Sequence, residues 1–159
     1  MATEAQYACF KDIFDRESVR QEQLIERGKV FLSIITLYLG LLGVAVDEIV
    51  PEIRGNWLAV CAYLASFAAF LLSIALVIRA LGIYKYVYPT DPERVVLQIE
   101  DDWPMDSEFF DDRIAELAAA FKTNHPANER RANLLKLASF SMLAGIGLQA
   151  IVLSSLVFL

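Results

Sequence analysis

The chain has 159 residues, 57% of them hydrophobic, and a formal net charge of −6. The length suits a single domain, but the hydrophobic fraction exceeds that of ordinary soluble domains and indicates membrane spans. The acidic balance argues against nucleic acid as a partner, because no basic surplus is available to neutralise phosphates. We expect an all-α integral membrane protein with three transmembrane helices and additional cytosolic helices. Its transmembrane helices should contact the lipid bilayer, which is therefore an expected partner.

Residues 1–29 are expected to form a cytosolic N-terminal helix. Thr3 and Gln6 have the spacing of a capping box, in which each side chain bonds the backbone N–H of the other residue. Six acidic and five basic residues leave no positive surplus to attract anionic lipids. We therefore expect this helix to pack against other cytosolic helices; the alternative is a helix that lies on the membrane surface.

The first transmembrane helix is expected over residues 30–50, with an uncharged core from Val30 to Val46. Small side chains recur along it at spacings of three and four, which places them on one helix face that a neighbouring helix can approach closely. The small-residue face of this span comprises Ser33, Thr36, Gly40 and Gly43. Such a face serves either tight packing between two spans or the lining of a pore.

An acidic turn from Asp47 to Asn56 is expected next, followed by the second transmembrane helix over residues 57–80. No residue from Trp57 to Ile78 is charged, and a helix of that length is about 33 Å long, which matches the hydrocarbon core of a bilayer. The small-residue face of this span comprises Ala59, Ala62, Ser66, Ala69 and Ser73. Phe70 lies outside that set, and we expect it to face lipid.

Residues 81–133 are expected to form a cytosolic helical segment. Asp91 and Pro92 predict a helix start, whereas residues 92–101 fit a helix or a strand equally well. A further helix is expected from Asp106 or Ser107, with an apolar stripe that should pack against the N-terminal helix. The expected packing residues are Phe110, Ile114, Leu117 and Phe121 on this stripe, with Phe10 and Phe14 on the N-terminal helix.

The third transmembrane helix is expected over residues 134–159. A turn at 124–126 should precede it, and His125 within that turn is expected to be a cap or a surface residue and not a catalyst. The helix-packing residues of the third span are Ser141, Gly145 and Gln149. Because an amide inside the membrane needs a partner, Gln149 predicts an interhelical hydrogen bond or a ring of glutamines in an oligomer.

The distribution of basic residues predicts the orientation of the chain. Five precede the first span, one lies between the first and second spans, and eight lie from Arg79 to Lys136. Because basic residues accumulate on the cytoplasmic side, the N-terminus should be cytoplasmic and the C-terminus should lie on the outer face of the plasma membrane.

The sequence carries no motif typical of an enzyme. It lacks a glycine-rich phosphate loop and a nucleophile with a histidine and a carboxylate. Cys9 and Cys61 show no metal-ligand spacing, and we expect no disulfide between them. We therefore expect no catalytic residues, no metal site and no cofactor.

Two stretches, IERGKVFLSIITLYLG at the entry to the first span and NERRANLLKLASF at the entry to the third, are part of a recognisable layout. With a short outer turn and a cytosolic segment between spans two and three, the chain resembles the small multi-span effectors of bacterial anti-phage defence, including those triggered by cyclic nucleotides. The resemblance implies a non-enzymatic inner-membrane protein that disrupts the bilayer or forms a pore. Its cytosolic segment would receive the signal, either a cytosolic protein or a small molecule.

Small-residue faces on three spans are more close-packing surface than one three-helix bundle needs, so we also expect a homo-oligomer. The alternative function is that of a structural or accessory membrane subunit, which anchors a cytosolic partner through residues 81–133.

Overall fold

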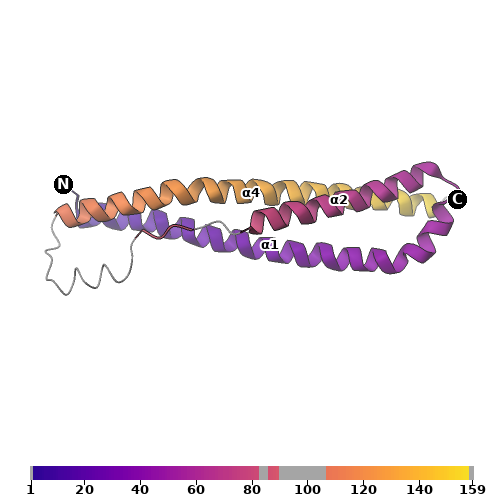
Figure 1. Cartoon of the computed structure of the whole chain (residues 1–159), viewed down its shortest axis with the longest axis horizontal. Coiled ribbons are helices and arrows are strands. Elements are labelled where there is room, and N and C mark those ends of the chain that lie inside the picture. Colours follow the sequence, from indigo (N-terminus) through magenta and orange to yellow (C-terminus); the bar gives the residue numbers. More distant parts are fainter. Residues whose placement is uncertain (1, 83–85, 90–106, 158–159) are drawn as a thin grey trace. The chain divides into compact units, whose positions relative to one another are not determined.

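The computed structural model describes residues 2–82, 86–89 and 107–157, which form three long helices and no strand. Helix α1 covers Glu4–Ile53, α2 covers Trp57–Leu81 and α4 covers Ser107–Val157 (Figure 1). The expected all-α class is therefore confirmed for the described part of the chain. The helix start expected at Asp91 and Pro92, and the helix or strand expected over residues 92–101, lie outside the described residues.

All three helices are long and apolar enough to cross a membrane. In the most apolar stretch of α1 only 6% of the residues are buried inside the chain, against 28% in α2 and 22% in α4. Helix α1 therefore leaves the largest share of its apolar stretch uncovered by the rest of the chain.

The chain divides into two compact units. Unit 1 comprises Met1–Leu24 and Ile83–Arg130, and unit 2 comprises Ile25–Gly82 and Arg131–Leu159. Helices α1 and α4 contribute residues to both units, whereas α2 belongs to unit 2 alone.

The starts of α1 and α2 follow from side chains that cap free backbone N–H groups. Gln6 Oε1 accepts the Thr3 N–H at 2.9 Å, and Thr3 Oγ1 accepts the Gln6 N–H at 3.4 Å, which confirms the predicted capping box. Before α2, Asn56 Oδ1 accepts the N–H groups of Leu58 at 3.1 Å and Ala59 at 3.3 Å. Asn56 is thus the N-cap that starts α2 at Trp57.

Helix α4 runs through Pro126 without ending, so the turn expected at 124–126 is wrong. Asn124 and Asn128 are buried, at 2% and 1% exposure, whereas Pro126 lies on the exposed side. One face of α4 is therefore buried on both sides of the proline. An internal proline costs about 3 kcal/mol, and the hydrogen bonds of Asn124 to Val87 and of Asn128 to Glu17 hold the helix on both sides of it.

The acidic turn expected from Asp47 is also shorter than predicted. Helix α1 continues to Ile53, and only Arg54 and Gly55 form the turn before Asn56. Ile49 and Ile53 are buried in a core cluster of unit 2, so their apolar contacts extend the helix beyond Asp47. The other buried members of this cluster are Ala59, Tyr63 and Val152.

The core of unit 1 forms where α1 and α4 meet. Phe14, Leu117 and Ala120 are buried together, with Tyr7 and Tyr86 partly buried against them. Of the other expected packing residues, Phe110 lies 5.9 Å from Tyr7, ring centre to ring centre, and Phe121 stacks on His125 at 5.0 Å. Ile114 is half-buried, and Phe10 is 40% exposed.

Phe70 of α2 is fully buried, so the expectation that it faces lipid is wrong. Its ring centre lies 5.0 Å from that of Tyr38 on α1. On α4, a Cβ added to Gly145 would meet the Phe70 ring at 3.0 to 3.2 Å. The absence of a side chain at Gly145 provides the space that the ring occupies.

Candidate functional site

Polar side chains gather at several places in the described part of the chain, among them a cavity in unit 1, a buried carboxylate between α1 and α4 in unit 1, and a contact between α2 and α4 in unit 2. Among residues 2–82, 86–89 and 107–157, no three His, Cys, Asp or Glu side chains come together as possible metal ligands.

Unit 1 contains a cavity of about 350 Å³. Helix α1 supplies most of its wall, and α4 and the segment 86–89 supply the remainder. The lining residues are Tyr7, Lys11, Phe14, Asp15 and Ser18 from α1, Arg113 and Leu117 from α4, and Tyr88 and Pro89 from the segment 86–89. The lining therefore combines aromatic rings with side chains of both charges.

Asn124 fixes the segment that carries Tyr88 and Pro89. Its Oδ1 accepts the Val87 N–H at 3.0 Å, and its Nδ2 donates to the Val87 carbonyl oxygen at 2.8 Å. One amide side chain thus satisfies both backbone groups of Val87. This pairing holds the segment 86–89 to α4 and positions one wall of the cavity.

Tyr86 anchors the same segment through its ring. The ring centre lies 6.0 Å from that of Phe14 and 5.3 Å from that of Tyr88. Burial raises the pKa of the Tyr86 hydroxyl, and the neighbouring Ser18 and Asn124 side chains offset part of this rise. The hydroxyl makes no hydrogen bond of good geometry to the residues that the structure describes.

Two positive side chains reach the cavity from different helices. Arg113 is only 7% exposed, donates to Glu116 Oε2 at 2.9 Å, and lies 5.4 Å from the centre of the Phe109 ring. Lys11 is exposed and lines the cavity from α1. Asp15 follows Lys11 by one helical turn on the same wall.

A buried carboxylate pairs α1 with α4 in unit 1. Asn128 Nδ2 donates to Glu17 Oε1 at 2.9 Å, while His125 Nδ1 and Arg20 Nη1 lie 3.4 and 3.7 Å from Oε2. A buried charge is costly unless it is hydrogen-bonded or paired. This contact therefore favours one register of the two helices. His125 contributes to it as a helical residue with 42% of its side chain exposed.

An ion pair follows one turn further along. Arg20 Nη2 donates to Glu129 Oε1 at 2.6 Å. The hydrogen bond to Glu129 raises the pKa of Arg20, and the hydrogen bond from Arg20 lowers the pKa of Glu129. Both side chains are more than a third exposed, so this pair contributes little to stability.

In unit 2, hydroxyl and amide groups link α2 to α4. Gln149 Nε2 donates to Ser66 Oγ at 2.7 Å, and Ser66 Oγ donates to the Tyr63 carbonyl oxygen at 2.7 Å. Ser73 donates to the Ala138 carbonyl oxygen and Ser141 to that of Ala69, each at 2.8 Å. The Gln149 contact is an interhelical hydrogen bond, made within one chain.

The small-residue faces of α2 and α4 lie against other parts of unit 2. Ala59, Ser66 and Ser73 are buried on α2, as are Gly145 and Gln149 on α4. Ala62, Ala69 and Ser141 are half-buried.

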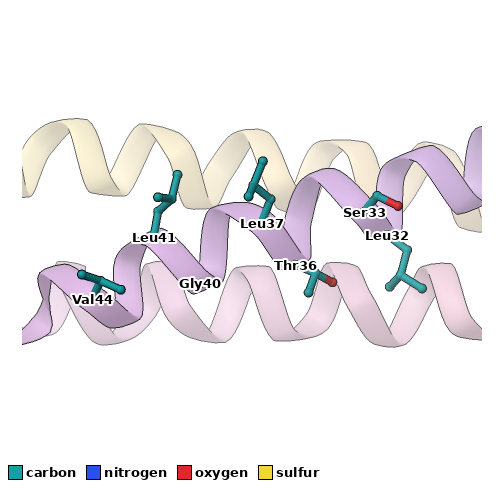
Figure 2. Close-up of a pocket in the computed structure, with 7 residues that line it drawn as sticks. All are labelled: Leu32, Ser33, Thr36, Leu37, Gly40, Leu41 and Val44. Carbon is teal, nitrogen blue, oxygen red and sulfur yellow. The ribbon is translucent and has the colours of Figure 1, made fainter.

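The small-residue face of α1 is exposed. Ser33, Thr36, Gly40 and Gly43 are all solvent-accessible, and a Cβ added to either glycine would meet no atom within 4 Å. An open groove of about 550 Å³ runs along this face. In Figure 2, Leu37 and Leu41 point to one side of the α1 ribbon, Leu32 and Thr36 point to the other, and Gly40 lies on the ribbon between Leu37 and Leu41.

Several residues at these sites were not singled out by the sequence. They are Lys11, Glu17, Arg113, Asn124 and Asn128. Asn124 and Asn128 are four residues apart, a spacing that places both on one helix face. With Ala120 before them, this pattern is a signal that could have identified a polar layer in a paired helix.

Comparison with known proteins gives no match: no family model, no curated protein and no solved structure corresponds to the chain.

Proposed function

We propose that the protein is a non-enzymatic, multi-pass protein of the bacterial inner membrane that self-associates through the exposed face of α1. In the assembled state it acts as a membrane effector, disrupting the bilayer or forming a pore. Unit 1 provides its cytosolic control. The orientation that follows from the basic residues places the N-terminus in the cytoplasm and the C-terminus outside.

The observation that carries this proposal is the difference between the three small-residue faces. Ser73 and Ser141 make hydrogen bonds between α2 and α4, and Gly145 accommodates Phe70. Gly40 and Gly43 of α1 have open space before them. Small residues favour close helix approach in membranes, so the α1 face is suited to a helix of a second copy.

The proposal is tested by native mass spectrometry of the full chain in a mild membrane mimic. We expect a defined homo-oligomer, and we expect Gly40→Leu to dissociate it by blocking close approach. Gly147→Leu is the matched control, because Gly147 on α4 also has open space where a Cβ would lie. A monomeric wild type, or equal effects of the two leucines, would contradict self-association through α1.

Effector activity has its own test. Triggered expression of the wild type should depolarise the membrane, as followed with a potential-sensitive dye, and Gly40→Leu should not. An unchanged potential with an assembled wild-type protein would exclude the effector function while leaving the assembly intact.

The second candidate function is that of an accessory subunit anchoring a cytosolic partner. It is favoured by Phe10 and Ile13 on α1 in unit 1, which are 40% and 43% exposed. A monomeric protein in the mass measurement would favour this function over the first.

A further inference from the structure

We infer that the cavity of unit 1 is a binding site for a small organic anion with a flat apolar body. This inference names a ligand class for the cytosolic control assumed above, although binding itself can be measured whether or not the chain assembles.

The size of the cavity sets the size of the ligand. Its volume of about 350 Å³ lies at the lower end of the usual range for small-molecule pockets, roughly 300 to 1,000 Å³. It suits a compound of one or two rings. A peptide or nucleic acid would need a larger surface.

The aromatic lining sets the nature of the ligand body. Tyr7, Phe14 and Tyr88 line the cavity, together with Leu117 and Pro89. Aromatic side chains provide large apolar contact areas and favour offset or edge-on packing with another ring. Tyr88 is 73% exposed, so its ring is accessible to an incoming ligand.

The positions of the basic side chains set the charge of the ligand. Tyr7 of α1 lies beside Phe110 of α4, and Phe14 lies beside Leu117 one heptad later on each helix. Arg113 therefore lies between these two levels on α4, as Lys11 does on α1. Charge-assisted hydrogen bonds from such groups to a carboxylate or phosphate are stronger than neutral ones.

Asp15 and Glu116 limit how much negative charge the site accepts. Glu116 already pairs with Arg113, and Asp15 lines the cavity one turn from Lys11. We therefore expect Lys11 to be the side chain that makes the cavity prefer an anionic ligand over a cationic one. A polyanion would be repelled by Asp15, whereas a single anionic group near Lys11 is accommodated.

The wall formed by the segment 86–89 connects binding to a measurable change in the chain. Asn124 bonds both backbone groups of Val87, and Tyr88 and Pro89 follow directly along the chain. A ligand packed against Tyr88 stabilises the two hydrogen bonds between Asn124 and Val87. Exchange of the Val87 amide hydrogen with solvent should therefore slow when the ligand is bound.

The test uses the full chain in lipid nanodiscs, with empty nanodiscs as the reference, and phenyl phosphate as the probe. Calorimetry should show saturable binding that weakens at high salt. Inorganic phosphate lacks the ring and benzyl alcohol lacks the charge, so each should bind at least tenfold more weakly. Benzyltrimethylammonium, a cation of similar size, should not bind.

Two pairs of variants locate the site. Lys11→Gln should weaken phenyl phosphate binding roughly tenfold, the loss of one charge-assisted hydrogen bond, and Lys122→Gln on the exposed face of α4 should not. Tyr88→Ala should weaken binding, and Tyr7→Leu, which keeps an apolar wall, should weaken it less.

Four results would overturn the inference. They are absence of saturable binding by phenyl phosphate, equal binding in Lys11→Gln and Lys122→Gln, tighter binding of the cation, and unchanged exchange at Val87 in the saturated protein. None of these changes the mass of the assembled chain, so failure here is distinguishable from failure of the proposed function.

Discussion

Gln149 Nε2 donates a 2.7 Å hydrogen bond to Ser66 Oγ, and both side chains are buried, at 2% and 0% exposure. The Oε1 of Gln149 is also buried and makes no hydrogen bond to the described residues. Ser66 uses its own hydrogen for the Tyr63 carbonyl oxygen. The amide is therefore half-satisfied, and Ser66 is its described partner.

This geometry predicts that substituting Ser66 lowers the stability of the chain more than substituting Gln149. Ser66→Ala leaves the whole Gln149 amide buried without that partner and should destabilise the chain by about 1 kcal/mol. Gln149→Met removes the unsatisfied oxygen together with the donor, keeps the volume, and should be nearly neutral. Unfolding by a denaturing detergent measures both.

Ser154→Ala is the control for this pair, because Ser154 is exposed and bonds the carbonyl oxygen of Ala150 in its own helix. A larger loss for Gln149→Met than for Ser66→Ala would show that the hydrogen bond contributes more than the buried oxygen costs.

Gly145 and Gly147 should respond in opposite directions to alanine. A Cβ at Gly145 would lie 3.0 Å from the nearest Phe70 ring atom, whereas one at Gly147 would meet nothing within 4 Å. We expect Gly145→Ala to destabilise unit 2 by about 1 to 3 kcal/mol through overpacking. Gly147→Ala should stabilise it by about 0.5 to 1 kcal/mol through helix propensity. Thermal unfolding in nanodiscs provides the comparison, and a stabilising Gly145→Ala would mean that Phe70 is free to move.

The three long helices could be predicted because apolar runs of transmembrane length are a strong one-dimensional signal. The continuation of α4 through Pro126 could not be predicted, since proline is normally a helix breaker. The proline is tolerated in this helix because Asn124 and Asn128 on either side of it are buried and hydrogen-bonded to Val87 and Glu17, residues distant in the sequence.

The small-residue spacing identified which residues share a face, but not which neighbour covers that face. Gly40 and Gly145 have the same local pattern, yet one is open and the other lies against Phe70. The same ambiguity applies to Phe70, since a large ring beside small residues can point to lipid or to a neighbouring helix, and here it is fully buried. The difference arises from contacts between helices, which a periodicity does not contain.

The Asn124–Val87 pairing predicts a local stability change. Asn124→Leu removes the groups that bond the Val87 N–H and carbonyl oxygen, so the Val87 amide should exchange its hydrogen at least tenfold faster. Hydrogen exchange followed by mass spectrometry over residues 86–89 measures this. Thr123→Ala is the control, because Thr123 is exposed and bonds the Ala119 carbonyl oxygen of its own helix. Equal exchange in both variants would show that the segment is held by Tyr86 alone.

The Arg20–Glu129 pair predicts a pH dependence of stability with a definite sign. The hydrogen bond from Arg20 lowers the pKa of Glu129, so the ionised carboxylate is favoured in the folded chain. Its contribution is fully present above the usual pKa of a glutamate and is lost as the pH falls through the lowered pKa. The stability difference between the wild type and Glu129→Gln should therefore be largest near neutral pH and shrink on acidification.

Arg20→Gln removes the cause of the shift, so the stability difference between the wild type and this variant should also shrink on acidification. Thermal unfolding between pH 7 and pH 3, roughly the range over which a glutamate titrates, measures both differences. A difference that stays constant over this range would mean that the 2.6 Å contact does not affect the titration of Glu129.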